Sequence, residues 1–351
     1  MTLIQVNQRR RLPVALALVS TATLLLTACG GGSDGDGDGG GGGGDDLAIT
    51  FIPKQLNNPY TDVVLGGGED GAGEAGFASN EVVGPLDASA SSQVSFINAE
   101  TQAGTDVIVI AANDPDAVCQ SLEEARSNGA SIVAFDSDTN PDCRDVFISQ
   151  VVAKDVALIQ LEIMSEQIGG SGQIAILSAT ANATNQNEWI KFMEEELAAN
   201  PDYADIELVT TVYGDDDDTK SFQEAQGLLQ AYPDLKGIIS PTTVGIAATA
   251  RYLSTSQYKG QVALTGLGLP NEMREFVKDG TVSEFALWDP AQLGYVAAFA
   301  GKALADGDIT GEEGDTFEAG ELGEKEVGEN GVVIVGPPTR FNTENIDDYD
   351  F

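Results

Sequence analysis

The amino-acid sequence predicts an α/β protein with two doubly wound lobes joined by a hinge. Short apolar runs rich in β-branched residues alternate with longer amphipathic stretches, which is typical of parallel strands and their crossover helices. The length favours two lobes over one, because about 320 residues follow the expected export signal and single cores seldom exceed about 300 residues. We therefore expect a Rossmann-like sheet with helices on both faces in each lobe.

The strands are expected at the apolar runs, which are too short for helices and have no polar face. These runs are residues 49–52, 107–112, 132–135, 174–177, 238–239 and 262–264. Between them, apolar residues recur at helical spacing. Two such sets are Trp189, Ile190, Met193 and Leu197, and Leu293, Val296, Ala297, Ala300 and Leu304.

The chain divides into four expected parts. Residues 1–28 form an export signal and residues 29–46 a Gly/Asp-rich linker that contains no apolar residue after Cys29. We expect the N-terminal lobe over 47–151 plus about 290–306. The C-terminal lobe is then 152–289 plus about 307–351.

The N-terminal segment has the marks of a lipoprotein signal. Arg9 to Arg11 precede an apolar run from Leu12, and the stretch from Leu26 to Cys29 resembles a bacterial lipobox. The alternative is a single-pass membrane anchor, but the run is marginally short for a bilayer and contains Pro13. We therefore expect an extracytoplasmic protein that contacts the cell membrane only through lipid on Cys29.

The charge and the missing histidine exclude several functions. The chain has 56 acidic and 17 basic residues, a net charge of −39, so it should repel nucleic acid and anionic lipid surfaces. It contains no histidine, which excludes Ser-His-Asp and Cys-His nucleophiles and removes the usual nitrogen ligand of zinc. The carboxylate run from Asp215 to Asp218 could hold a metal, but it is better interpreted as a solvated turn before a helix. We expect no metal and no cofactor.

The two remaining cysteines form an even pair. With Cys29 lipidated, Cys119 and Cys143 are left in an oxidising compartment, where we expect a disulfide. Two free buried thiols are the alternative.

Polar residues follow the predicted strands. In doubly wound sheets, ligands bind at the carboxyl ends of the strands, so these are the positions to inspect. They offer carboxylates, amides, an ammonium group and aromatic rings, which suit the hydroxyls and apolar faces of a polyol. The positions include Lys54, Asn113, Asp136, Thr243, Trp288 and Asp289.

Several motifs in this order resemble periplasmic sugar-binding proteins of ABC importers. They are IPKQLNNPY (52–60), AANDPDAVC (111–119), FDSDTNPDCR (135–144), NATNQNEW (182–189), YPDLKGIISPTT (232–243), FALWDP (285–290) and NIDDYDF (345–351). The chain is most similar to rhamnose-binding proteins and to relatives that bind autoinducer-2. The resemblance implies a type I periplasmic-binding-protein fold and a monomer, not an enzyme, that closes over a small sugar and delivers it to the transmembrane subunits of an ABC permease.

The resemblance also implies ligand-binding residues. The set known from the autoinducer-2 binders falls on Lys54, Asp136, Asn185, Gln186, Pro241 and Thr243. Asn185 replaces an expected Asp and Thr243 replaces an expected loop Ala, so the resemblance favours rhamnose or a similar deoxyhexose over autoinducer-2. Asn185 is expected a few residues before a helix that starts near Glu188.

Ribose-type binders resemble the Asn58-Pro59-Tyr60 element. The resemblance therefore adds Asn58 and Tyr60 as contacts, and it favours Trp288 in the pocket over the core.

Two other functions remain possible. A glycosidase could use Asp136 and Asp289 as paired carboxylates without histidine. A sensory receptor for sugar or autoinducer-2 would use the same closed form as a transport protein.

Overall fold

The structure is a computed structural model that describes residues 46–351. The expected export signal, Cys29 and nearly all of the linker lie outside the described residues. Within the part described, no helix is long and apolar enough to cross a membrane.

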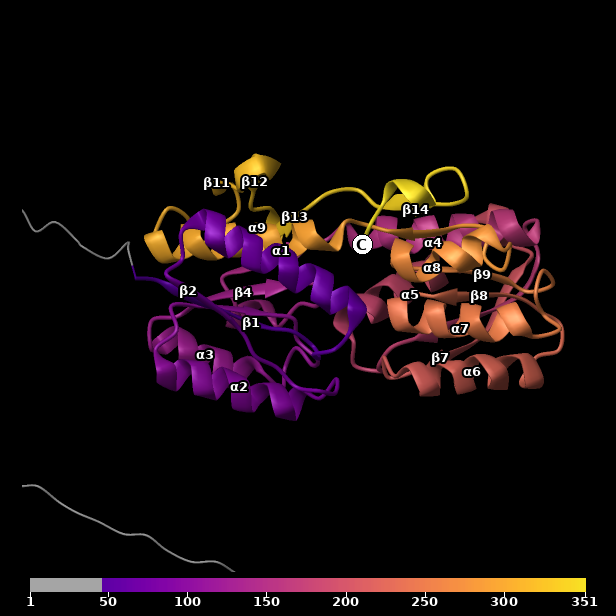
Figure 1. The fold of residues 1–351 in the computed structure, drawn as a ribbon, viewed down its shortest axis with the longest axis horizontal. Coiled ribbons are helices and arrows are strands. Elements are labelled where there is room, and N and C mark those ends of the chain that lie inside the picture. Colours follow the sequence, from indigo (N-terminus) through magenta and orange to yellow (C-terminus); the bar gives the residue numbers. More distant parts are fainter. Residues whose placement is uncertain (1–45) are drawn as a thin grey trace, which may run out of the picture. The chain divides into compact units, whose positions relative to one another are not determined.

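The first lobe is built on a sheet of six parallel strands in the order β13-β5-β4-β3-β1-β2 (Figure 1). The strands are β1 (Ala48–Ile52), β2 (Ser79–Val82), β3 (Val107–Ile110), β4 (Ser131–Phe135), β5 (Val146–Ser149) and β13 (Val332–Ile334).

Helices cover both faces of this sheet. The helices α1 (Pro59–Ala75) and α9 (Pro290–Asp306) lie side by side on one face, and α2 (Ala90–Ala103) and α3 (Cys119–Ser127) cover the other (Figure 1). Successive residues of β3 therefore enter different cores: Val107 and Val109 pack under α1 and α9, Ile108 and Ile110 under α2 and α3. This explains why the whole strand is apolar.

Glycine allows the close approach of α1 and α9. A Cβ atom on Gly67 would lie 1.9 Å from the carbonyl oxygen of Ala291, and one on Gly294 would lie 2.0 Å from that of Val64. Because either contact is impossible for a real side chain, glycine is required where these helices touch.

The second lobe has a parallel sheet in the order β7-β6-β8-β9. Helices α4 and α5 contact each other, as do α6 and α7, and a short antiparallel pair, β10 with β14, extends the lobe. Its strands are β6 (Gly172–Ser178), β7 (Ile206–Tyr213), β8 (Leu235–Ser240), β9 (Ala263–Gly266), β10 (Phe285–Leu287) and β14 (Thr339–Phe341). Its helices are α4 (Ala153–Ile168), α5 (Thr184–Ala199), α6 (Asp218–Ala231), α7 (Thr243–Thr255) and α8 (Pro270–Lys278).

The chain passes between the lobes three times: between β5 and α4, between β10 and α9, and between β13 and β14. One predicted boundary was wrong. The stretch 307–335 was expected in the C-terminal lobe, but it contains β13, which pairs with β5, and the antiparallel strands β11 (Thr316–Glu318) and β12 (Glu324–Glu326), which pack near α9. It belongs to the first lobe because β5 leaves an open sheet edge that β13 completes.

The α/β class and the two-lobe architecture are confirmed, and each predicted strand coincides with an observed one. One predicted helix boundary was wrong. Helix α5 begins at Thr184 rather than near Glu188, so Asn185 and Gln186 lie in its first turn. The N-cap residue is Ala183, which has no side-chain acceptor, so the usual capping signal is missing.

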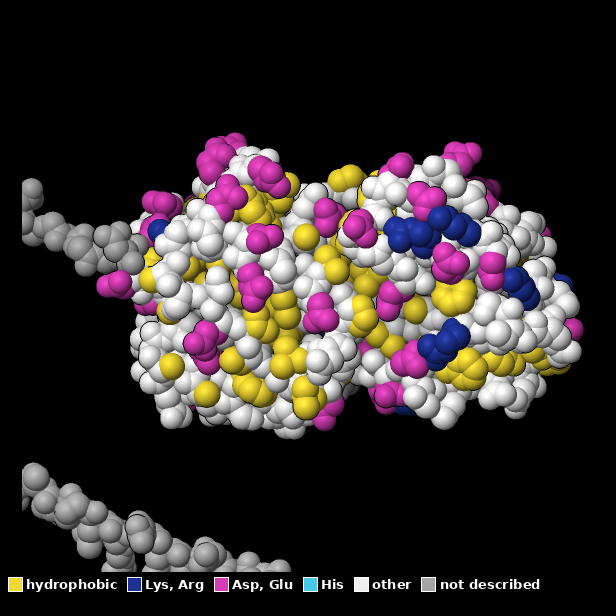
Figure 2. Space-filling view, viewed as in Figure 1, with side chains coloured by type: hydrophobic (Ala, Val, Ile, Leu, Met, Phe, Trp, Pro, Cys, Tyr) yellow, Lys and Arg dark blue, Asp and Glu magenta, His cyan; other side chains and the backbone are white. Residues whose placement is uncertain are grey.

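Acidic side chains are spread over both lobes, whereas basic side chains on the visible face gather mainly on the second lobe (Figure 2). Cations of the second lobe form ion pairs: Lys220 pairs with Asp215, Arg251 with Asp218, and Lys278 with Asp347. On this face the first lobe therefore presents a largely uncompensated acidic surface.

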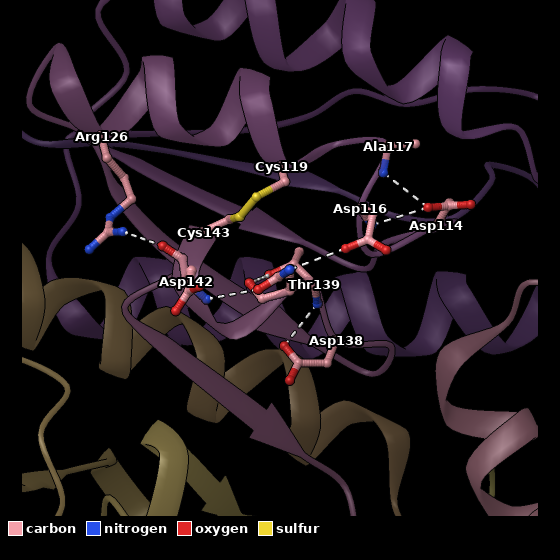
Figure 3. The surroundings of a disulfide bond; sticks show 10 residues. Asp114, Asp116, Ala117, Cys119, Arg126, Asp138, Thr139, Asp142 and Cys143 are labelled. Carbon is pink, nitrogen blue, oxygen red and sulfur yellow. Dashed lines mark hydrogen bonds between the residues drawn. A yellow bond between two sulfur atoms is a disulfide. The ribbon is translucent and has the colours of Figure 1, made fainter.

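Cys119 and Cys143 are disulfide-bonded, as expected (Figure 3). Cys119 begins α3, and Cys143 ends the short 3-10 turn Pro141–Cys143 before β5. The bond therefore links the loop after β4 to α3, the helix that precedes β4. Arg126 supports the same region by donating to the backbone oxygen of Asp142 over 3.0 Å.

Candidate functional site

Lys54 and Asp136 form the first-lobe base of the site. Lys54 follows β1 and Asp136 follows β4, so both stand at the carboxyl edge of the sheet. Lys54 Nζ lies 3.4 Å from Asp136 Oδ2, and Asp136 is only 8 % exposed. The backbone of Asp136 has a φ of +59°, in the left-handed region that few non-glycine residues adopt outside constrained sites.

Tyr60 and Trp288 extend this pair into a hydrogen-bonded chain. Tyr60 Oη donates to Asp136 Oδ1 over 3.0 Å, and Trp288 Nε1 donates to Tyr60 Oη over 3.0 Å. The two rings meet edge to face with centroids 6.1 Å apart. Burial, together with the charge of Asp136, raises the pKa of Tyr60 well above its ordinary value, so this hydroxyl remains a donor at neutral pH.

Asn185 brings the second lobe to this chain. Its Oδ1 accepts from Lys54 Nζ over 3.2 Å, and its Nδ2 donates to the backbone oxygen of Asp136 over 3.2 Å. The neighbouring Gln186 accepts from Ser178 Oγ at 3.0 Å and from the amide of Ala179 at 2.9 Å. Gln186 thereby fixes the turn between β6 and α5.

The end of β8 supplies another wall. Pro241, Thr242 and Thr243 face the cavity, and Thr243 is 7 % exposed. The resemblance implied a loop position for Thr243, but it is the first residue of α7. Asn58 has two roles. It borders the cavity, and its Oδ1 caps α1 by accepting from the backbone amides of Tyr60 and Thr61.

These residues surround a cavity of about 630 Å³, its open mouth included. Polar groups lie at the strand ends, and an apolar wall completes the enclosure. Of the sequence-predicted residues, the cavity is lined by Lys54, Asn58, Tyr60, Asp136, Asn185, Gln186, Pro241, Thr243 and Trp288. The apolar wall includes Val64, Ala111, Phe135, Trp189, Leu267 and Leu287.

Asn113 and Asp289 were predicted to line the site, and the structure places both outside the cavity. The side-chain Nδ2 of Asn113 donates to the backbone oxygen of Lys54 over 2.8 Å, and the backbone amide of Asn113 donates to Gln93 Oε1. It therefore supports Lys54 from behind. Asp289 caps α9 by accepting from the amide of Ala291 over 3.0 Å. Because Asp289 is a helix cap outside the cavity, it does not form the carboxylate pair with Asp136 that a glycosidase would need.

Among the lining residues that the sequence did not predict are Gln55, Trp189, Thr242 and Asp216. Trp189 was recognised only as part of a helical apolar stripe, yet its ring meets that of Trp288 with centroids 5.9 Å apart. Asp216 was grouped with its acidic neighbours as a solvated turn. That interpretation suits Asp217, whose Oδ1 caps α6 by accepting from the amide of Lys220, but it is wrong for Asp216.

Arg144 and Asp138 form a separate ion pair beside the site. Arg144 Nε and Nη2 donate to the two carboxylate oxygens of Asp138 over 2.6 and 2.8 Å, and Arg144 is 5 % exposed. Arg144 Nη1 also donates to the backbone oxygen of Asn330. Burial raises the pKa of Asp138, although Arg144 opposes the shift. The pair ties the loop after β4 to the stretch that precedes β13.

Residues 49–309 match the periplasmic binding protein domain. The chain is also similar to solved structures, among them three for which the match covers most of both chains. A sugar ABC transporter protein from Actinomyces odontolyticus is 71 % identical, with a TM-score of 0.72, and the match covers 87 % of this chain and 98 % of that one.

The second is an ABC transporter solute-binding protein from Clostridium phytofermentas with bound L-rhamnose. It is 34 % identical with a TM-score of 0.82, and the match covers 87 % of this chain and 98 % of that one. The third is LsrB from Clostridium saccharobutylicum in complex with AI-2, which is 25 % identical with a TM-score of 0.81. That match covers 87 % of this chain and all of the other.

Proposed function

Because the chain belongs to the periplasmic binding protein family, whose members bind substrates and are not enzymes, we propose that it binds a deoxyhexose such as L-rhamnose. It is a sugar-binding protein of an ABC transporter. The bound sugar is held between the two lobes and passed to a membrane permease.

The cross-lobe contact of Lys54 with Asn185 carries the proposal. Polar groups from both lobes come within hydrogen-bond distance of each other at the cavity, so one small polyol can contact both lobes at once. A ligand that contacts both lobes stabilises the closed arrangement more than the open one and shifts the population toward it. Closure is then the signal that the permease recognises.

The apolar wall supports a deoxyhexose. A 6-deoxy sugar combines several ring hydroxyls with one methyl group, and the methyl needs a surface that makes no hydrogen bonds. Phe135, Leu287 and Trp288 offer such a surface, while Lys54 and Asp136 offer a donor and an acceptor to the hydroxyls.

Asn185 favours rhamnose over autoinducer-2. Its Nδ2 faces the backbone oxygen of Asp136, where an aspartate would place two acceptors against each other. The amide is therefore built into this site, and it presents both a donor and an acceptor. The greater identity to the rhamnose-bound structure agrees with this choice.

We propose that lipid on Cys29 tethers a monomer outside the cytoplasm and that the linker over 29–46 keeps the lobes away from the membrane. The transmembrane subunits of an ABC permease are the proposed protein partner.

Calorimetric titration of one preparation with L-rhamnose, L-fucose, D-ribose and autoinducer-2 tests the proposed ligand. We expect L-rhamnose or another deoxyhexose to bind most tightly. Tighter binding of autoinducer-2 would replace the proposal with uptake or sensing of that signal, and binding of ribose alone would exclude a deoxyhexose.

A further inference from the structure

Asp216 is set apart from the acidic run in which it lies. Asp215, Asp217 and Asp218 are exposed, whereas Asp216 is half-buried and lines the cavity. Asp217 caps α6, and Asp218 pairs with Arg251 through both carboxylate oxygens. The roles of these neighbours are structural, and they leave Asp216 as the carboxylate of this run that borders the site.

The backbone at Asp216 is held in an unusual conformation. Asp215 has a φ of +55° and Asp216 a φ of +50°, so two consecutive non-glycine residues lie in the left-handed region. Such a conformation costs energy and persists where the surroundings enforce it, often at binding sites. Here a backbone hydrogen bond within the second lobe holds the turn, since the amide of Asp215 donates to the oxygen of Ala179 over 2.9 Å. Gln55 Nε2 of the first lobe also donates to the backbone oxygen of Asp216, over 3.4 Å.

The side chain of Asp216 has one protein donor. Thr242 Oγ1 donates to its Oδ1, and among residues 46–351 no other side chain donates to this carboxylate. Oδ2 therefore stays available to the cavity. An ionised carboxylate accepts through both oxygens, so a half-buried Oδ2 without a protein donor is suited to accept from a ligand.

Burial opposes the ionisation of Asp216. Burial raises its pKa and the charges of Asp136 and Asp215 add to the increase, whereas Thr242 and Lys54 act in the opposite direction. The cavity thus holds Asp136 and Asp216 against one lining cation, Lys54, among the described residues. Its net charge is negative, which disfavours an anionic ligand.

We propose that Asp216 is a specificity-determining residue of the sugar site, supplied by the second lobe, whose Oδ2 accepts a hydroxyl of the sugar while Asp136 acts from the first lobe. This inference rests on the proposed function and narrows it. The ligand is a neutral polyol with hydroxyl donors toward both lobes, and sugar acids are rejected.

The variant Asp216→Asn tests the assignment. It keeps an oxygen for Thr242 and removes the charge and one acceptor, so the loop should retain its conformation. We expect L-rhamnose to bind about 10- to 100-fold more weakly, the range that a hydrogen bond to a charged group supports. The matched control is Asp218→Asn, an exposed carboxylate two residues away, which should leave the affinity unchanged.

Three outcomes separate this inference from the function on which it rests. If wild-type protein binds L-rhamnose and Asp216→Asn binds it equally well, Asp216 is not part of the site and the proposed function stands. If wild-type protein binds no neutral monosaccharide, the proposed function fails and the inference fails with it. If wild-type protein binds D-glucuronate as tightly as L-rhamnose, the exclusion of sugar acids is wrong.

A second measurement does not depend on any ligand. We expect ligand-free Asp216→Asn to melt at a higher temperature than wild type at neutral pH, because a half-buried charge has been removed and the bond from Thr242 retained. A lower melting temperature would assign Asp216 a structural role and overturn the inference.

Discussion

Lys54 and Asn185 are joined across the lobe boundary, with Lys54 Nζ donating to Asn185 Oδ1 over 3.2 Å. The same amide donates from Nδ2 to the backbone oxygen of Asp136. Asn185 thus uses both halves of its amide toward the first lobe, which neither an aspartate nor an aliphatic residue could do.

Replacing this amide should change the ligand preference. In Asn185→Asp, a carboxylate oxygen would face the backbone oxygen of Asp136, so we expect L-rhamnose to bind about 10-fold more weakly or worse, since a buried acceptor is left unpaired. Autoinducer-2 should lose less affinity. Calorimetry with both ligands measures the ratio, and Asn80→Asp on the exposed edge strand β2 is the matched control. An unchanged ratio would contradict the proposed role of Asn185.

The two acids of the DSD sequence should have opposite effects. Asp136→Ala removes the acceptor of Tyr60 and of the ligand, so binding should weaken by about 2 kcal/mol or more while the fold survives. Asp138→Ala leaves buried Arg144 without its partner, so unfolding should become easier by about 3 kcal/mol. Calorimetry and urea unfolding of both variants distinguish the two roles. Equal effects of the two variants on affinity would show that the roles are not separate.

The stabilisation expected for Asp216→Asn should depend on pH. Because the folded-state pKa of Asp216 is raised above its ordinary value of 3.8, the folded protein holds this proton more tightly than the unfolded chain, and wild-type stability falls as pH rises through the folded-state pKa. Lys54, Asp136 and Asp215 are the charged groups that act on it.

The variant should therefore gain most above the folded-state pKa, and the gain should disappear below 3.8, where Asp216 is protonated in both states. Melting curves of both proteins from neutral pH down to about pH 3.5 measure the difference. A gain that grows as the pH falls would have the wrong sign.

Loss of the disulfide should destabilise the first lobe. The bond joins residues separated by 24 positions, a loop for which chain entropy gives about 3 kcal/mol of stabilisation. The double variant Cys119→Ser/Cys143→Ser should have a free energy of unfolding lower by about this amount. Urea unfolding of both proteins measures the difference. Mass spectrometry of alkylated, unreduced wild-type protein is the check, and two labelled thiols would refute the bond in the native protein.

Lipidation can be tested apart from binding. Cys29→Ala should release the protein from membranes in a fractionation experiment, because the proposed anchor is that thiol. Its affinity for sugar should not change, since all of the lining residues of the cavity lie beyond the linker. A variant that remains with the membrane would contradict the lipoprotein assignment.

The central strands and the location of the site were predictable because both depend on local sequence. A strand buried on both faces, such as β3, must be apolar throughout, and the polar residues that follow such strands must meet at one sheet edge. Lys54 and Asp136 were found in this way.

Elements fixed by distant partners were not predictable. Strand β2 has the sequence SNEV and is mostly exposed, so no apolar run marks it. Strand β13 joins β5 from far along the chain, and its three residues carry no signal of that pairing. Asp216 reaches the cavity through a left-handed backbone that its acidic neighbourhood conceals, whereas Asn113 and Asp289 stand next to the site in sequence and support it from outside.

The three passages of the chain between the lobes affect how such a protein can be altered. Because the first lobe is assembled from residues before α4, from α9 and from the stretch through β13, neither lobe corresponds to one uninterrupted coding segment. A chimaera that exchanged one lobe with that of a relative would need three junctions placed together. The contributions of the two lobes to sugar preference should therefore be inherited jointly, and a new preference is more easily reached by point substitution within the cavity than by recombination.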